Sequence, residues 1–232
     1  MILGISGSAR KPDVSNTYKL VKIVLENTGC EYELISLRGK DISGCIACLG
    51  CVEDNVCKVE DDFREMRDKI VAADAYVIGS PNYYSGLNSM THAFLERWFQ
   101  FRHREGNLLW GKIAVAVGVG GTSGKYPANE IEKFFSYNFI QTIAKIFGQG
   151  PASCYSCGYG DSCKVGIPYF LYGEGVEISE ESKPDVTKQE DVMKSAIEAG
   201  KLLGKMVKSG YDRSEITARM QKRMMEMFAG SV

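Results

Sequence analysis

The sequence predicts an α/β fold built on one parallel β-sheet, and three observations support this prediction. Short apolar runs typical of buried strands alternate with longer amphipathic segments typical of helices. The fourth apolar run is almost entirely hydrophobic, as expected for a central strand that is covered on both faces. Loops rich in glycine, serine or asparagine follow the first, third and fourth runs. The 232 residues are enough for one large domain with an appendage.

The expected elements follow from these patterns in chain order. The expected strands are short apolar runs over residues 1–6, 32–37, 75–79, 112–119 and 151–155. The expected helices carry apolar residues at helical spacing over residues 16–27, 62–73, 87–103, 127–148, 187–209 and 212–228. We expect a three-layer arrangement with the five strands in the order 2-1-3-4-5.

Two further segments shape the expected organisation. Residues 156–187 are irregular and rich in glycine and tyrosine, and their length indicates a functional or subunit-contact excursion. We expect one main domain over residues 1–209 and a helical tail over residues 210–232. The tail repeats Ile216, Met220 and Met224 at intervals of four, which predicts a packing or oligomer surface.

The composition excludes several classes of protein. The net charge is −1, so no basic field favours nucleic acid as a partner. No apolar run approaches the roughly 20 residues that a membrane-spanning helix needs. The chain opens directly on an apolar strand without the pattern of an export signal. We therefore expect a cytoplasmic protein, in which the eight cysteines serve metal binding or redox chemistry.

The loop after the first strand has the composition of an anion-binding site. Its small residues let the backbone approach a phosphate, and N–H groups at the start of the following helix can bind one. No lysine stands where a nucleotide-binding P-loop needs it, and no G-x-G-x-x-G is present. A structural turn rich in serine and glycine remains the alternative. The candidate binding residues are Ser6, Ser8, Arg10, Ser15, Asn16 and Thr17.

The loops after the third and fourth strands are suited to an aromatic ring. An asparagine and exposed backbone can hydrogen-bond the edge of a heteroaromatic ring, and a tyrosine can pack beside its face. The candidate residues are Pro81, Asn82, Tyr83, Tyr84, Ser85 and Gly86, with Gly118, Gly120 and Gly121 in the next loop. With the strands in the order 2-1-3-4-5, these loops share the crevice in which FMN binds in flavodoxin-like folds. The sequence therefore predicts a flavodoxin-like domain with bound FMN.

Four cysteines form one compact run in the loop over residues 39–61, after the second strand. Cys45, Cys48, Cys51 and Cys57 have the spacing C-x2-C-x2-C-x5-C, which can supply the four thiolates of an iron–sulfur cluster. Structural zinc sites with four thiolates usually use two separated C-x2-C pairs. Redox thiols without a metal are the third possibility, and we favour the cluster.

A second group, Cys154, Cys157 and Cys163, follows the last expected strand, so we expect it to border the flavin crevice. It has only three thiols, so a cluster would need a ligand from elsewhere. Buried or free thiols are the simplest interpretation, and a redox-active pair or a metal site are the alternatives.

Three motifs together resemble a known family. The opening G-I-S-G-S-A-R at 4–10 with S-N-T at 15–17, and G-S-P-N-Y-Y-S-G at 79–86, resemble the NADPH-dependent FMN reductase superfamily. With the cysteine run, the chain is similar to the iron–sulfur flavoprotein branch. The resemblance implies FMN, a [4Fe–4S] cluster near a flavin, and a homodimer or homotetramer. The first loop is longer than the family pattern by a residue or two around positions 12–14.

The function that follows is flavin-dependent oxidoreduction. We expect electrons to pass between FMN and a [4Fe–4S] cluster, from ferredoxin or NAD(P)H to a small acceptor such as a quinone. The flavin supplies the chemistry, so no catalytic side chain is assigned. The alternatives are an NAD(P)H-dependent FMN or quinone reductase without a working cluster, a non-enzymatic electron carrier, and a redox sensor.

Overall fold

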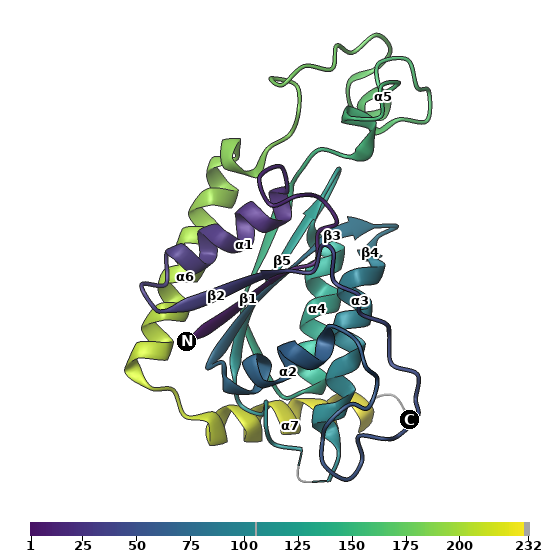
Figure 1. Ribbon diagram of the computed structural model, residues 1–232. Helices are drawn as coiled ribbons and strands as arrows, with labels where there is room; N and C mark the ends of the chain where they lie inside the picture. The colour runs from purple at the N-terminus through teal and green to yellow at the C-terminus, as the bar shows by residue number, and fades with distance from the viewer. Residues whose placement is uncertain (105, 230–232) are drawn as a thin grey trace.

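The computed structural model describes residues 1–104 and 106–229, and within them six strands form one sheet between layers of helices (Figure 1). Five strands are parallel: β1 (Ile2–Ser6), β2 (Tyr32–Ser36), β3 (Ala75–Tyr83), β5 (Ile113–Gly120) and β6 (Gln141–Gln149). Their order, β2-β1-β3-β5-β6, is the expected path of five parallel strands. The sixth strand, β4 (Gly86–Leu87), pairs antiparallel with the end of β3 and was missed by the sequence analysis.

Helices cover both faces of the sheet. The α-helices are α1 (Asn16–Glu26), α2 (Phe63–Ala72), α3 (Ser89–Glu96), α4 (Lys125–Tyr137), α5 (Ile167–Tyr172), α6 (Glu190–Ser209) and α7 (Arg213–Ala229). Short 3-10 helices are η1 (Arg97–Arg102), η2 (Ser153–Tyr155) and η3 (Val186–Lys188). One buried cluster joins the sheet to α1, α6 and α7, and the other joins it to α2, α3 and α4. Figure 1 shows these two layers on opposite sides of the strands.

The expected helix over residues 127–148 is wrong in its second half. Helix α4 ends at Tyr137, and Phe139 takes a left-handed backbone conformation with φ of 51°. The chain then turns into β6, where the β-branched residues Thr142, Ile143 and Ile146 favour an extended backbone. The expected strand over residues 151–155 is also wrong, because the chain there has already left the sheet and forms η2.

Other expected elements differ mainly at their ends. The expected helix over residues 87–103 is α3 followed by η1, with Asn88 capping α3 through a hydrogen bond from the Thr91 N–H (3.3 Å). The expected tail helix is α7, and residues 230–232 of the expected tail lie outside the described residues. Among the described residues, no helix has both the length and the apolar character to cross a membrane.

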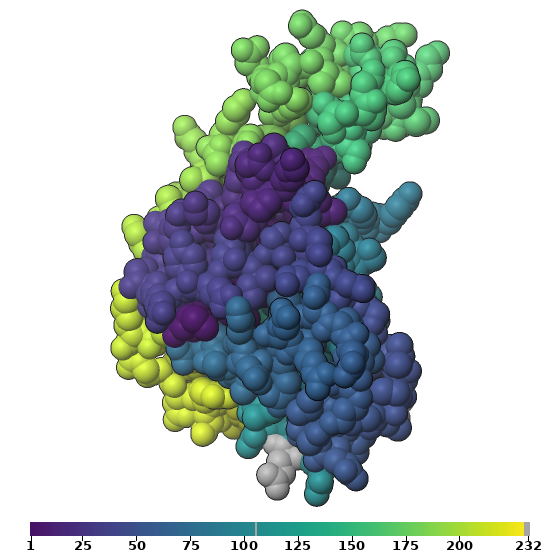
Figure 2. Space-filling model, in the orientation of Figure 1, coloured from purple at the N-terminus to yellow at the C-terminus, as the bar shows by residue number. Residues whose placement is uncertain are grey.

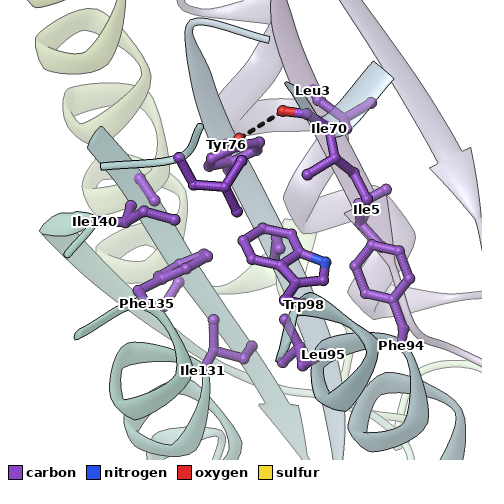
Figure 3. Packing of buried hydrophobic residues seen from close by; sticks show 14 of the residues in the cluster. Leu3, Ile5, Ile70, Tyr76, Phe94, Leu95, Trp98, Ile131, Phe135 and Ile140 are labelled. Carbon is purple, nitrogen blue, oxygen red and sulfur yellow. Dashed lines mark hydrogen bonds between the residues drawn. The ribbon is translucent and has the colours of Figure 1, made fainter. Parts of the chain in front are cut away.

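The core beneath α2 and α3 is aromatic and fully buried (Figure 3). Trp98 lies 5.2 Å from Tyr76 and 5.9 Å from Phe94 between ring centroids. The Tyr76 hydroxyl donates to the carbonyl of Ile70 (2.6 Å), one of the last carbonyls of α2, which have no partner within the helix. This hydrogen bond holds the C-terminal end of α2 against the body of the domain.

Lys112 supports the same end of α2 from beneath. Its Nζ donates to the carbonyl of Val71 (2.7 Å), and the side chain is buried. Burial, with a smaller contribution from Arg213, lowers the pKa of Lys112 to about 7. Buried donors thus satisfy backbone carbonyls in the last turn of α2.

Residues 151–187, here called the lobe, project from the carboxyl edge of the sheet. In Figures 1 and 2 the lobe is the green region at the top, next to the purple loop that follows β1. The segment expected to be irregular contains α5 within it. Its surface carries exposed apolar side chains, with Val165 80% and Phe170 71% exposed.

Candidate functional site

A cavity of about 410 Å³ opens where the loops after β1, β3 and β5 meet the start of the lobe. Its volume lies within the range of cofactor sites. Many of the predicted binding residues line it: Ser8, Arg10, Asn16, Thr17, Pro81, Asn82, Tyr83, Tyr84, Gly120 and Gly121. The other candidates lie outside its lining: Ser6, Ser15, Ser85, Gly86 and Gly118. The three predicted loops therefore share one cavity.

The β1 loop presents the start of α1 to the cavity. Ser15 caps this helix, because its Oγ accepts a hydrogen bond from the Tyr18 N–H (3.1 Å). The first turn of α1 has no acidic residue, and Thr17 is 3% exposed. None of the described carboxylates forms an ion pair with Arg10, which also lines the cavity. Free N–H groups at a helix start beside a cation form an anion-binding corner.

Asn82, near the end of β3, lines the cavity and has a side-chain oxygen without a hydrogen-bond partner among the described residues. The Asn82 Nδ2 donates to the carbonyl of Ser123 (2.7 Å), which sets the orientation of the amide. Its Oδ1 is buried and has no hydrogen-bond partner among the described residues. A buried acceptor without a partner costs free energy, which a ring N–H of a ligand would recover.

Two tyrosines close the hairpin beside Asn82. Tyr84 and Ser85 both have left-handed backbones, with φ of 49° and 62°, which gives the tight turn between β3 and β4. Tyr83 is 52% exposed and Tyr84 is fully exposed, although both line the cavity. This side of the cavity is therefore open to a planar substrate or partner.

The glycines after β5 have different roles. A Cβ at Gly118 would lie 1.8 Å from the carbonyl oxygen of Gly124, so this glycine serves the turn and lies outside the lining. A Cβ at Gly121 would instead meet Ala152 and Ile167 of the lobe at 2.9 Å. Gly121 thus lets the lobe approach the β5 loop across the cavity.

The sequence analysis expected the second cysteine group beside the crevice but missed the other residues that line the cavity from the lobe and from the end of β6. Gly150, Pro151, Ala152, Cys154 and Ile167 line the cavity, but residues 151–155 had been assigned to a strand. The cysteine at the start of a glycine-rich segment was the one available signal. No hydrophobic periodicity in the sequence indicates how residues of the lobe fold back to line the cavity.

The loop over residues 39–61, here called the cysteine loop, is held by a buried ion pair. Arg97 on η1 donates to Asp61, and their side chains are 1% and 6% exposed. Arg97 also donates to the carbonyls of Ser43 (3.1 Å) and Val59 (3.4 Å), on either side of the cysteine run. Burial acts to raise the pKa of Asp61, but hydrogen bonds from Arg97 and from the Ser43 N–H outweigh it and lower the pKa.

Backbone contacts tie two of the cysteines to the end of α3 and to η1. The Cys45 N–H donates to Glu96 Oε2 (3.1 Å), and the Cys57 N–H donates to Gln100 Oε1 (2.9 Å). Burial raises the pKa of Cys51, and repulsion from the other thiolates of the run adds to this. Such mutual repulsion is what a bound cation would relieve.

The donor set of the cysteine loop suits a soft metal centre. All four cysteines are free, Cys51 is buried and Cys57 is half-buried. Ala47 and Leu49 flank Cys48 and have left-handed backbones, so the chain turns sharply on both sides of this cysteine. Among the described residues, no three histidine, cysteine, aspartate or glutamate side chains stand close enough to hold a metal ion. The chemistry of the donors fits an iron–sulfur cluster, whereas the sulfur atoms are not gathered into a ligand shell.

Comparison with known proteins gives a consistent result. The sequence profile described as NADPH-dependent FMN reductase matches residues 1–150. An iron–sulfur flavoprotein of Methanocaldococcus jannaschii is 31% identical over 157 residues, covering 66% of this chain and 79% of that protein. An iron–sulfur flavoprotein of Archaeoglobus fulgidus is 31% identical over 148 residues, covering 64% and 76%.

Solved structures agree in fold. A structure described as RosB with a bound intermediate matches with a TM-score of 0.59 and 18% identity, covering 97% of this chain and 86% of that one. A flavone reductase matches with a TM-score of 0.56 and 17% identity, covering 89% of this chain and 62% of that one.

The fold and the family together define a flavin-dependent oxidoreductase. The chain belongs to the NADPH-dependent FMN reductase family, in its iron–sulfur flavoprotein branch.

Proposed function

We propose that this chain binds FMN in the cavity, holds a [4Fe–4S] cluster in the cysteine loop and passes electrons between them. The donor is ferredoxin or NAD(P)H, and the acceptor is a small molecule such as a quinone. The observation that carries the proposal is the meeting of three predicted loops at one cavity that is lined by Asn82, whose buried Oδ1 has no hydrogen-bond partner among the described residues. Bound FMN would supply the exchange between two-electron and one-electron transfer.

Different residues of the cavity would hold the phosphate and the ring of FMN. Arg10, Thr17 and the N–H groups at the start of α1 bind the phosphate end. Asn82 accepts a hydrogen bond from the ring, and Tyr83 packs beside it. Gly121 and the lobe shield the cavity from water on the side opposite the tyrosines.

FMN titration followed by fluorescence quenching tests this assignment. Arg10→Ala and Asn82→Leu should each weaken FMN binding about tenfold, because each removes a hydrogen-bonding or charged partner of roughly 1–2 kcal/mol. The matched controls are Arg64→Ala on the exposed face of α2 and Asn129→Leu on α4, neither of which lines the cavity. Equal affinity in all four variants would refute the site.

The cluster would be held by Cys45, Cys48, Cys51 and Cys57. The support is the spacing of the run, the softness of four thiolates and the anchoring of both ends of the loop by Arg97. Anaerobic purification with iron and sulfide analysis tests it. Cys51→Ser should lose iron and keep the yellow flavin, whereas Cys30→Ser should keep both. Zinc in place of iron would favour the zinc alternative.

The alternative of a flavin reductase without a working cluster is favoured by the open side of the cavity at Tyr83 and Tyr84. A nicotinamide could stack there without moving the lobe. Anaerobic mixing with NADPH separates the possibilities. Bleaching of the bound flavin within seconds supports a nicotinamide donor, and bleaching only by reduced ferredoxin supports the electron-transfer role.

The proposal includes a homodimer or homotetramer. Exposed apolar side chains gather on the lobe at Phe170 and Tyr172 and on α7 at Met225 and Phe228. Such surfaces are typical of subunit contacts. Light scattering coupled to size-exclusion chromatography tests it, and a monomer at micromolar concentration would refute this part.

A further inference from the structure

The lobe brings the second group of cysteines to the cavity proposed for FMN. Cys154 lies in η2, directly after the end of β6, and lines the same cavity as Ser8, Asn82 and Gly121. Cys157 follows two residues after the end of η2 and is exposed. A thiol in contact with a redox cofactor site, beside a second thiol in solvent, needs an explanation beyond packing.

The turn draws Cys154 and Cys157 together. The Ser156 N–H donates to the carbonyl of Ser153 (3.0 Å), which closes a turn that contains Cys154 and directly precedes Cys157. The Cys157 Sγ lies 3.5 Å from the carbonyl oxygen of Cys154. Two cysteines three positions apart can close a disulfide, and C-x2-C is a spacing of redox-active pairs. Both cysteines are free thiols here.

The Cys154 thiol is in contact with the start of α5. Its Sγ accepts a hydrogen bond from the backbone N–H of Ile167 (3.4 Å), which also lines the cavity. One member of the pair therefore faces the cofactor site, and the other is accessible from outside.

Two other cysteines provide a contrast. Cys30 is half-buried beside α6, where its Sγ lies 3.7 Å from the carbonyl of Thr28 and 3.8 Å from that of Gly204. Cys163 is half-buried in the turn closed by the Gly166 N–H, which donates to the Cys163 carbonyl (2.9 Å). Neither Cys30 nor Cys163 lines the cavity, so both cysteines are suitable controls.

We propose that Cys154 and Cys157 form a dithiol–disulfide couple that exchanges two electrons with the flavin of the cavity. The proposal rests on the proposed function, since that function supplies the flavin. On reduction the S–S bond breaks, and reduced flavin provides two electrons and one proton while solvent provides the second proton. Two thiols and oxidised flavin result. In reverse, two thiols lose two electrons and two protons to oxidised flavin and solvent, and the S–S bond forms.

The chain itself makes the couple measurable. Cleavage by trypsin after Lys145 and Lys164 yields one peptide, residues 146–164, that carries Cys154, Cys157 and Cys163 and none of the other cysteines. Chymotrypsin can then cut after Tyr155 and Tyr159 and place each cysteine on its own fragment. Mass spectrometry therefore reads both the redox state and the pairing, independently of turnover.

The test uses the full chain loaded with FMN and oxidised with diamide, which is then removed. The flavin is reduced anaerobically by light with EDTA, and free thiols are blocked with iodoacetamide. We expect a Cys154–Cys157 disulfide before illumination and its loss afterwards. The yield of new thiol should exceed that of the FMN-free chain, treated identically, by about tenfold.

Variants separate the pair from its neighbours. Cys154→Ser and Cys157→Ser should each abolish the disulfide, whereas Cys163→Ser and Cys30→Ser should preserve it. A disulfide between Cys154 and Cys163, no disulfide at all, or one that persists while the bound flavin is bleached would overturn this proposal alone. Failure of the chain to bind FMN, visible in its absorption spectrum, would refute the proposed function as well.

Discussion

The cysteine loop and the lobe both carry thiols, but they are tied to the sheet by different contacts. The cysteine loop is held by the buried Arg97, whose guanidinium binds Asp61 and the backbone on both sides of the cysteine run. The end of the lobe is held by a more exposed ion pair between Lys19 and Asp185, whose side chains are 32% and 23% exposed.

This difference suits two kinds of redox group. A cluster needs ligands whose positions hardly change between its oxidation states, and a buried ion pair is costly to break. A dithiol must move its sulfur atoms together and apart, and partly exposed contacts allow this. The comparison thus links the stiffness of each region to the chemistry proposed for it.

The largest expected effect is at the anchor of the cysteine loop. Arg97→Met leaves the buried carboxylate of Asp61 without its partner, and we expect a loss of about 3–5 kcal/mol in the free energy of unfolding. Urea denaturation measures it. The double variant Arg97→Met with Asp61→Leu should recover a large part of the loss, because no buried charge remains. A loss below about 1 kcal/mol in the single variant would show that the loop is not held by this pair.

The same pair should give the loop a distinct dependence on pH. The pKa of Asp61 is lowered in the folded protein, so its stabilising contribution is present above the unfolded value near 3.8 and is lost as pH falls through the folded pKa. In Arg97→Met, burial without the partner should raise this pKa instead. The stability difference between the two proteins should therefore shrink from pH 7 towards pH 4, by up to about 1.4 kcal/mol per pH unit. If the difference in unfolding free energy between the two proteins does not change with pH, Asp61 is not the group that Arg97 stabilises.

The anchor of the lobe should matter much less. Lys19→Met removes a partly exposed ion pair with Asp185, and we expect a loss of about 0.5–1 kcal/mol. Because the pair joins α1 to the end of the lobe, tryptic cleavage at Lys164 should also become faster. Lys22→Met, which removes an exposed pair within α1, is the matched control for the cleavage rate. A loss equal to that of Arg97→Met would remove the contrast between the regions.

The smallest expected effect is at the contact between the lobe and the β5 loop. A Cβ at Gly121 would stand 2.9 Å from Ala152 and from Ile167, so Gly121→Ala should push the lobe outwards. We expect a change of less than about 1 kcal/mol in stability, because the lobe can yield, together with weaker FMN binding. Titration of both proteins with FMN measures this. Tighter binding would indicate that the lobe obstructs the cavity.

Much of the candidate site could be predicted because its signals are local. The composition of the loop at Ser8–Thr17 and the sequence around Asn82 indicate their roles without reference to the rest of the chain. The cysteine run is equally local. The lobe could not be placed, because its contact with Gly121 joins segments about 30 residues apart along the chain and leaves no periodic pattern.

Sequence alone determined the alternation of strands and helices, the path of the parallel strands and the loops that gather at their ends. These features follow from the spacing of apolar residues and from the geometry of parallel sheets, which are properties of short stretches. The tertiary structure alone decided that residues 141–149 form a strand, that Arg97 binds Asp61 and that Ile167 of the lobe reaches the cavity. Each of these depends on contacts between distant residues, whose free energies exceed local propensity but appear only once the chain has folded.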